Sequence, residues 1–403
     1  MNFVKLIRCI YYVFLSYFFK FFFPNIVKSI SNKKNNVLLL TPFRRDINFD
    51  KVIKNSGLGL LFLKTEFTQK MHGIFFLERG KYNFYDYVNK IKKQKMRVYL
   101  YGIFINNLMK YLINNYNVKI ICNFAIHYKS EMFYDRYATK NRIKFITLHR
   151  ECLFQTDAVK KFIFNKLKKV KYEGTKLIVH NETAKKIFSS SGFCKKKNID
   201  VVGPLKVDHL KEKSLEYKKI DKSVLIYMFG NSVGISTKKS FGSEWSKKND
   251  IGWNKMIDNL FSNIFENAKK FKKTKFIFKA RYKSVEFINF YNQFLKKYNL
   301  KNTKLIFEDS DFTYRKKASI IISYGSTAII ESMIFDKSIL VPFFNEVYEK
   351  KFKEYIPFKE IINTKISCNS VEQFNDKLRS NIMYNRKYCL SKKQNKYLIE
   401  KYL

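Results

Sequence analysis

The sequence predicts an α/β fold with two domains, each a parallel sheet covered by helices on both faces. Short apolar runs alternate with segments of helical spacing from residue 36 to residue 385. A polar, charged stretch at 206–222 interrupts this alternation, which then restarts. The 403 residues suffice for two domains of about 150–200 residues each. We therefore expect domains at 36–210 and 211–385, followed by a C-terminal tail helix at 386–403.

Residues 1–35 form a hydrophobic, basic segment that we expect to associate with a membrane. The uncharged run 9–19 is shorter than the roughly 20 residues of a spanning helix, so it could span only if Lys20 snorkelled to the interface. Aromatic residues next to Lys5 and Arg8 suit a helix lying among lipid head groups. The alternative is a first helix packed on the main body of the protein. No small-residue cleavage site indicates a removable signal peptide.

In the first half, the expected strands are NVLLLTP, VYLYGIF, VKIICNF, IKFITLH, KLIVHN and NIDVVGP. Helical spacing predicts helices at 85–95 and 158–167, and Gly192 is expected to close a further helix. In the second half, the expected strands are SVLIYMFG, KFIFKA, KLIFED, ASIIIS and SILVP. Helices are expected there at 254–271, 285–298 and 327–335. Strands that alternate with helices in this way favour parallel pairing.

The composition is strongly basic, with a formal net charge of +46 from 79 Lys and Arg against 33 Asp and Glu. Such a charge suits nucleic acid or an anionic lipid surface. Lys, Asn, Ile, Phe and Tyr all have A/T-rich codons, however, and the lysines are spread along the whole chain. Codon bias therefore accounts for the charge, and we expect no nucleic-acid partner. A basic nucleic-acid-binding protein stays the alternative from another functional class.

The six cysteines show no metal-site spacing, because no CxxC occurs among them. We expect no metal, and we expect the cysteines to be reduced residues of a cytoplasmic protein.

The strongest motif is IIISYGSTAIIESMIFDKSILVPFF, in which a buried strand ends at Ser323. A helix begins after the turn that contains Gly325, Ser326 and Thr327. The free N–H groups and the positive dipole end of this helix form a potential phosphate-binding site. Glu331 shares a helix face with Thr327, so its carboxylate could accept the paired hydroxyls of a ribose. The alternative is a plain N-cap with a solvated Glu331.

This arrangement resembles the donor-domain signature of the GT-B superfamily of glycosyltransferases, in particular capsule and surface-polysaccharide transferases and their epimerase-like relatives. The matching features are the turn 325–327, Glu331 and Pro342, and the VVGP strand and the basic FKAR strand end also look similar. The paired-Glu pattern of retaining families is absent. The resemblance covers most of residues 37–385. It implies two Rossmann-like domains facing an interdomain cleft, the first for the acceptor and the second for a nucleotide sugar.

Further donor-site candidates lie at strand ends of the second half. Lys279 and Arg281 end the strand KFIFKA, and strand ends in open α/β sheets point into the ligand crevice. Their charges could neutralise a diphosphate leaving group. Arg281 is the favoured candidate because a guanidinium can form two parallel hydrogen bonds with a phosphate. Gly230 permits close backbone approach, and Asn231 can donate to phosphate or sugar. The alternative for Lys279 is a solvated side chain without a ligand. The alternative for Gly230 and Asn231 is the ordinary beginning of a loop.

Candidate catalytic residues lie at a strand end of the first half. Sugar transfer needs a base that takes the acceptor proton, and His149 or Glu151 could serve at the end of IKFITLH. His180 is a weaker candidate, and Asn181 beside it could simply cap the following helix.

The resemblance to GT-B enzymes implies that the loop with Arg44 and Arg45 lies beside the acceptor site. There the two arginines could bind a lipid diphosphate or an acidic sugar chain. A solvated loop is the alternative.

Together these observations predict a metal-independent glycosyltransferase that moves a sugar from a nucleotide sugar to a surface-glycan acceptor, such as capsule or lipopolysaccharide. No cofactor is expected beyond the donor substrate. The enzyme would be cytoplasmic and peripheral to the anionic inner face of the cell membrane. The alternatives on the same scaffold are a nucleotide-sugar epimerase, a polyol-phosphate transferase and a catalytically dead scaffold.

Overall fold

A computed structural model of the chain describes residues 3–40, 53, 55–76, 84–126, 128–149, 156–203, 223–228, 254–280, 285–307, 312–335, 337–350 and 353–402. The chain divides into two compact units. Unit 1 comprises 1–151, 162–205 and 241–243, and unit 2 comprises 152–161, 206–240 and 244–403. The polar stretch 206–222 lies outside the described residues.

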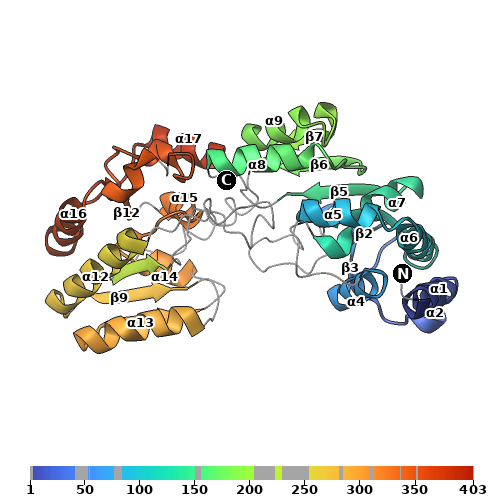
Figure 1. The fold of residues 1–403 in the computed structure, drawn as a ribbon, viewed down its shortest axis with the longest axis horizontal. Helices are drawn as coiled ribbons and strands as arrows, with labels where there is room; N and C mark the ends of the chain where they lie inside the picture. Colours follow the sequence, from blue (N-terminus) through green and yellow to red (C-terminus); the bar gives the residue numbers. More distant parts are fainter. Residues whose placement is uncertain are drawn as a thin grey trace. The chain divides into compact units, whose positions relative to one another are not determined.

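Unit 1 is built on a seven-stranded sheet with the order β1-β3-β2-β4-β5-β6-β7 (Figure 1). Its strands are β1 (Val27–Ser31), β2 (Asn36–Leu39), β3 (Gly59–Leu63), β4 (Val118–Asn123), β5 (Lys144–Leu148), β6 (Lys176–Val179) and β7 (Ile199–Val201). All neighbouring strands pair in parallel except β1, which pairs antiparallel with β3. The parallel sheet that the sequence predicts is thus confirmed, and the edge strand β1 and the strand β3 are additions to it.

The helices of unit 1 are α1 (Phe3–Ser16), α2 (Phe19–Phe22), α4 (Thr65–Phe75), α5 (Phe84–Lys92), α6 (Lys95–Tyr116), α7 (Tyr134–Lys140), α8 (Asp157–Leu167) and α9 (Glu182–Ser190), with 3-10 turns η1 (Lys129–Glu131) and η2 (Lys196–Asn198). Part of α8, residues 157–161, belongs to unit 2. Gly192, with φ +74°, follows the end of α9, so the expected glycine closure is confirmed.

The strand expected at VYLYGIF is wrong, because these residues lie inside α6. Along α6 the buried residues recur at helical spacing, as Leu100, Phe104 and Leu108 do on one face. The continuous apolar run that suggested a strand arises because this helix is contacted on several sides, by α1, α4, α5, α7 and β4. Within 98–104 the exposed position carries the aromatic Tyr99 instead of a polar residue, so the amphipathic pattern of the helix is weak there.

Helices α1 and α2 pack on α6, and α1 also packs on α4, as the dark-blue end of the chain in Figure 1 shows. Ser16 at the end of α1 accepts a hydrogen bond from Asn107 Nδ2 at 2.9 Å, and Phe19 lies 5.3 Å from the ring of Phe104. Within the described ranges, no helix is both long and apolar enough to cross a bilayer. The alternative of a packed first helix is therefore confirmed for one face of α1.

Unit 2 is built on a six-stranded parallel sheet with the order β10-β9-β8-β11-β12-β13. Its strands are β8 (Ser223–Tyr227), β9 (Lys275–Lys279), β10 (Thr303–Ile306), β11 (Ile320–Ile322), β12 (Ser338–Pro342) and β13 (Ser367–Cys368). Counted from β8, this order is 3-2-1-4-5-6, the order of the doubly wound nucleotide-binding fold. Four of these strands are buried at every described residue, β8, β11, β12 and β13, as expected for a parallel sheet covered on both faces.

The helices of unit 2 are α12 (Asn254–Lys270), α13 (Val285–Tyr298), α14 (Phe312–Lys317), α15 (Ala328–Ser332), α16 (Val371–Tyr384) and α17 (Lys392–Tyr402), with 3-10 turns η5 (Met333–Phe335), η6 (Asn345–Tyr348) and η8 (Lys359–Ile361). Helices α12 and α13 meet through stacked aromatic rings: Phe265 lies 4.8 Å from Phe278 of β9 and 5.0 Å from Phe294 of α13. The expected tail helix is present as α17, whose Tyr402 packs edge-on against Phe358.

Candidate functional site

The strand order of unit 2 reverses between β8 and β11, which are neighbours in the sheet but far apart in sequence. In open α/β sheets, ligands bind outside the carboxyl ends of the strands at such a switch point. Tyr227 ends β8, and Ser323 directly follows β11. These two residues therefore mark the position at which a nucleotide is expected to bind unit 2.

A buried ion pair between Arg315 of α14 and Glu331 of α15 lies at this switch point. Arg315 Nη1 is 2.8 Å from Glu331 Oε2, and the two side chains are 3% and 8% exposed. The Nε of Arg315 donates to Tyr227 Oη at 2.9 Å, and Thr327 Oγ1 donates to Glu331 Oε1 at 3.4 Å. One hydrogen-bonded network thus joins the end of β8 to the helices that flank β11.

The guanidinium of Arg315 also lies over two aromatic rings. Its central carbon is 5.6 Å from the ring centroid of Tyr227 and 5.7 Å from that of Phe335. Such cation–π contacts strengthen where water is excluded. Arg315 is therefore held in one orientation from three sides.

The turn between β11 and α15 combines a left-handed glycine with hydroxyl side chains, of which Ser323 is buried and Ser326 and Thr327 are partly exposed. Gly325 adopts φ +64°, a conformation that costs a residue with a Cβ roughly 1–2 kcal/mol. Ser326 Oγ accepts a hydrogen bond from the N–H of Ala328 at 3.2 Å. Ser323 is fully buried, and its Oγ has no hydrogen-bond partner among the described residues. Because buried hydroxyls are normally paired, Ser323 is a candidate ligand contact.

The structure brings most of the predicted donor residues together at one edge of unit 2. Glu331 and Thr327 share a helix face as expected, but Glu331 is buried, so the alternative of a solvated carboxylate is wrong. Lys279 at the end of β9 is only 7% exposed, and its Nζ donates to the carbonyl of Ala280 at 2.7 Å. The solvated-lysine alternative is therefore wrong for Lys279.

Three other predicted donor residues, Gly230, Asn231 and Arg281, lie outside the described residues. Arg315 was not among the candidates. Its signal in the sequence is weak: a single arginine in the segment FTYRKK of a chain in which lysine is the usual cation.

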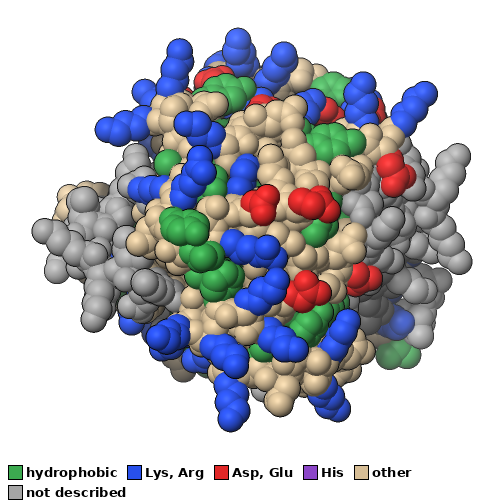
Figure 2. Space-filling view, turned by 90° about the vertical axis from the view of Figure 1, so that its left-hand side faces the viewer, with side chains coloured by type: hydrophobic (Ala, Val, Ile, Leu, Met, Phe, Trp, Pro, Cys, Tyr) green, Lys and Arg blue, Asp and Glu red, His purple; other side chains and the backbone are tan. Residues whose placement is uncertain are grey.

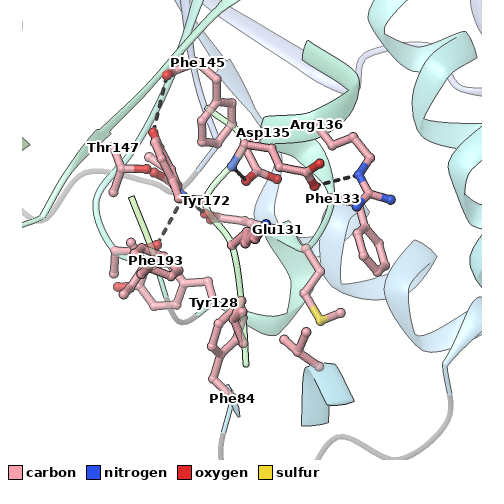
Figure 3. A pocket seen from close by; sticks show the side chains of 18 of the residues that line it. Phe84, Tyr128, Glu131, Phe133, Asp135, Arg136, Phe145, Thr147, Tyr172 and Phe193 are labelled. Carbon is pink, nitrogen blue, oxygen red and sulfur yellow. Dashed lines mark hydrogen bonds and ion pairs between the residues drawn. The ribbon is translucent and has the colours of Figure 1, made fainter. Parts of the chain in front are cut away.

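Unit 1 contains a cavity of about 290 Å³ next to β4 and β5, shown in Figure 3. Tyr172 and Phe193 form one side of it in this view, and Phe133 with Arg136 the other. Asn123 at the end of β4 also lines the cavity, and β4 neighbours β2 where the strand order of unit 1 reverses. Through Asn123 the cavity touches the carboxyl end of β4.

The charged side chains of this cavity are of both signs: three are acidic, Glu131, Asp135 and Glu173, and five are basic, Lys92, Arg136, Lys168, Lys169 and Lys171. Asn123 Nδ2 donates to Glu131 Oε2 at 2.9 Å and to the carbonyl of Ala125 at 3.1 Å, while Asn123 Oδ1 is buried without a partner in the part of the chain that the structure describes. Burial raises the pKa of the Asp135 carboxyl above its ordinary value, although a hydrogen bond from the N–H of Glu173 opposes this. Aromatic walls with a few oriented polar groups are typical of small-molecule sites.

The candidate base His149 lies directly after β5, and it is buried. Its backbone N–H donates to Ile178 O at 2.8 Å, and its ring is 5.4 Å from that of Phe188. Asn181 caps α9, because its side chain accepts from the N–H of Ala184 at 2.8 Å. The capping alternative for Asn181 is therefore confirmed.

The remaining acceptor-side candidates, Glu151, Arg44 and Arg45, lie outside the described residues. Catalytic roles for His149 and Glu151 stay predictions. Among the residues that are described, no group of three or more His, Cys, Asp or Glu side chains is placed to hold a metal ion.

No protein-family model matches this sequence, and no curated protein matches it. Several solved structures are similar in fold. A UDP-GlcNAc 2-epimerase from Methanocaldococcus jannaschii, in complex with UDP-GlcNAc and UDP, is 13% identical with a TM-score of 0.43, covering 91% of this chain and 98% of the other. The UDP-GlcNAc 2-epimerase from Neisseria meningitidis is 13% identical with a TM-score of 0.46, covering 91% and 85%. The Anabaena protein HepE, in complex with UDP-glucose, is 7% identical with a TM-score of 0.43, covering 91% and 95%. The fold class of this chain rests on its own strand orders.

Proposed function

We propose that this protein is an enzyme that binds a nucleotide sugar at the switch point of unit 2. One observation carries the proposal: the strand order 3-2-1-4-5-6 has a buried Arg315–Glu331 network at its reversal. A buried ion pair costs desolvation free energy that an apolar pair of the same size avoids. Its presence at the ligand-binding edge of the sheet therefore favours a functional reason for keeping it.

In this proposal the turn 325–327 receives the nucleotide phosphates through its backbone N–H groups and hydroxyls. Lys279 supplies positive charge at the end of β9, the strand on the other side of β8 from β11. Arg315 fixes the orientation of Glu331. The Glu331 carboxylate then accepts hydrogen bonds from the ribose hydroxyls. Ser323 gains a hydrogen-bond partner when the ligand is bound.

The reaction we favour is transfer of the sugar to an acceptor hydroxyl. The acceptor oxygen forms a bond to the anomeric carbon, the bond from that carbon to the phosphate oxygen breaks, and a base takes the acceptor proton. Charge develops on the departing phosphate, where fixed cations and N–H groups stabilise it. His149 and Glu151 remain the proposed bases, and the acceptor would be a surface glycan.

The cavity of unit 1 is the observation that favours a second substrate. It lies within a different unit from the nucleotide position, and its aromatic walls and carboxylates suit a sugar ring and its hydroxyls. The second candidate reaction is epimerisation of the nucleotide sugar, which is the activity named for the two epimerase structures described above.

A thermal-shift panel tests the nucleotide site directly. The purified protein is heated with CMP, CDP, UDP, GDP, dTDP and the corresponding nucleotide sugars, because a ligand that binds only the folded state raises the melting temperature. We expect one nucleotide family to stabilise the protein. The shift should disappear in Glu331→Gln and Arg315→Met, and it should persist in Glu400→Gln, which changes a carboxylate with 65% exposure. If no nucleotide stabilises the folded wild-type protein, the proposal is wrong.

Product analysis then separates the two reactions. The stabilising nucleotide sugar is incubated with the protein, and the mixture is resolved by chromatography. Transfer releases free nucleotide only when an acceptor is added. Epimerisation gives a second nucleotide sugar of equal mass without any acceptor.

A further inference from the structure

The outer face of α1 and α2 carries an unusual concentration of exposed apolar side chains. Of the eighteen large hydrophobic residues that are exposed in the described part of the chain, nine lie between residues 4 and 22. They are Val4, Ile7, Ile10, Tyr11, Phe14, Tyr17, Phe18, Phe21 and Phe22. We call these nine residues the N-terminal apolar surface. Phe21 is 76% exposed and Phe14 59%, although removing an aromatic ring from water is favourable.

The inner face of the same helices is already packed on unit 1. Cys9, Val13 and Phe19 are buried, and Phe19 stacks on Tyr111 of α6 at 5.4 Å. The exposed side chains are therefore not core residues that have failed to find a partner within unit 1. A helix that is apolar on both faces needs a second apolar environment.

The charge around this surface has one sign. Residues 1–45 contain eight Lys and Arg and no Asp or Glu. Lys5, Arg8, Lys20 and Lys28 are all exposed. Long basic side chains can reach head-group phosphates while their stems and the neighbouring aromatic rings stay in the apolar layer. A second copy of the chain would instead place cations against cations in a two-fold contact.

We propose that the N-terminal apolar surface docks on an anionic lipid bilayer, with α1 and α2 lying along the interface. The apolar side chains enter the boundary between head groups and acyl chains, and the surrounding Lys and Arg contact anionic head groups. The packed inner face keeps unit 1 attached to these helices, so a substrate held in the bilayer would lie near unit 1. This inference does not depend on which reaction the protein catalyses.

Vesicle flotation tests the proposal with the full-length protein. Phosphatidylglycerol vesicles are compared with phosphatidylcholine vesicles for the wild type, for Phe14→Gln/Phe21→Gln, and for the charge variant Lys5→Gln/Arg8→Gln/Lys20→Gln. The matched control is Met383→Gln/Tyr384→Gln, which alters two exposed apolar residues of α16. We expect the wild type and the control to float with anionic vesicles and both N-terminal variants to lose binding by roughly tenfold or more. Thermal melting checks that the variants remain folded.

Two results would overturn the proposal. One is anionic-vesicle binding by Phe14→Gln/Phe21→Gln that equals the wild type. The other is a wild-type protein that binds no vesicles but forms a concentration-dependent dimer, seen by light scattering, that the same variant abolishes. That result would assign the surface to self-association.

Discussion

At the residue scale, the pair formed by Arg315 and Glu331 concentrates several interactions in one place. Arg315 contacts Glu331, Tyr227 and Phe335, which come from three different elements of unit 2. Breaking a buried pair leaves an uncompensated charge, whereas replacing both partners by apolar residues removes the charge altogether. The two kinds of change should therefore have very different effects.

We predict that Glu331→Ala lowers the free energy of unfolding by about 3–5 kcal/mol, because it leaves the Arg315 guanidinium buried without its counter-charge. The double variant Arg315→Met/Glu331→Ala should be more stable than either Arg315→Met or Glu331→Ala alone, because it leaves no buried charge unpaired. Urea denaturation of the four proteins measures this coupling. Strictly additive effects would show that the two side chains do not stabilise each other.

A second residue-scale prediction concerns Asp135 in the cavity of unit 1. Burial raises its pKa in the folded state above the ordinary 3.8, so the favourable contribution of this group is present at low pH and is lost as the pH rises through the folded-state pKa. Asp135→Asn should therefore gain stability relative to the wild type as the pH rises from below 3.8. Unfolding free energies of both proteins across that range test the sign. If the free energy of unfolding of Asp135→Asn falls relative to that of the wild type as the pH rises, the raised pKa of Asp135 is contradicted.

The donor site was partly predictable at this scale. Thr327 and Glu331 lie four positions apart on one helix, and this local spacing is visible in the sequence. Arg315 was missed because its contact with Glu331 joins separate helices on either side of β11, and no local pattern records such a contact. Lys279 could be placed at a strand end, but its burial depends on the packing around β9.

At the element scale, amphipathic segments were predicted best. The helix expected at 285–298 matches α13 in both bounds, because its apolar residues follow one face. The expected strand at 98–104 is wrong because most of this part of α6 is buried and its exposed position carries the aromatic Tyr99, so the helical pattern is weak in the sequence. The two-residue strand β13 carries too few residues for any periodicity.

The N-cap of α9 gives the element-scale prediction. Asn181 accepts the N–H of Ala184, which would otherwise lie unpaired in the first turn. Asn181→Ala should lower the free energy of unfolding by about 1 kcal/mol, and Asn181→Asp should retain the stability because aspartate caps equally well. Chemical denaturation compares the three proteins. Equal loss in both variants would mean that the amide nitrogen of Asn181, rather than the cap, contributes the stability.

At the scale of the whole molecule, the positive charge is spread rather than gathered. On the face shown in Figure 2, Lys and Arg side chains lie across the surface with acidic residues between them. With a formal net charge of +46, some binding to any polyanion is expected at low salt, without selectivity for sequence.

We predict that a random DNA duplex binds this protein weakly and that its affinity falls steeply between about 50 and 200 mM salt. Arg315→Met should leave duplex binding unchanged, because the buried guanidinium contributes little to the surface. Fluorescence anisotropy with several duplexes measures both effects. Binding that is selective for one sequence and survives high salt would instead support the nucleic-acid alternative.

The sequence by itself determined the α/β class, most helices and strands of unit 2 and the turn that follows β11, because these depend on near-neighbour spacing and on glycine and capping residues. Only the tertiary structure decided the strand orders, the partner of Glu331, the cavity of unit 1 and the packing of α1 on one face only. The physical reason is that these features join residues distant in the chain. Whether two such segments meet depends on how all the apolar surfaces of a unit are buried together, which no single segment encodes.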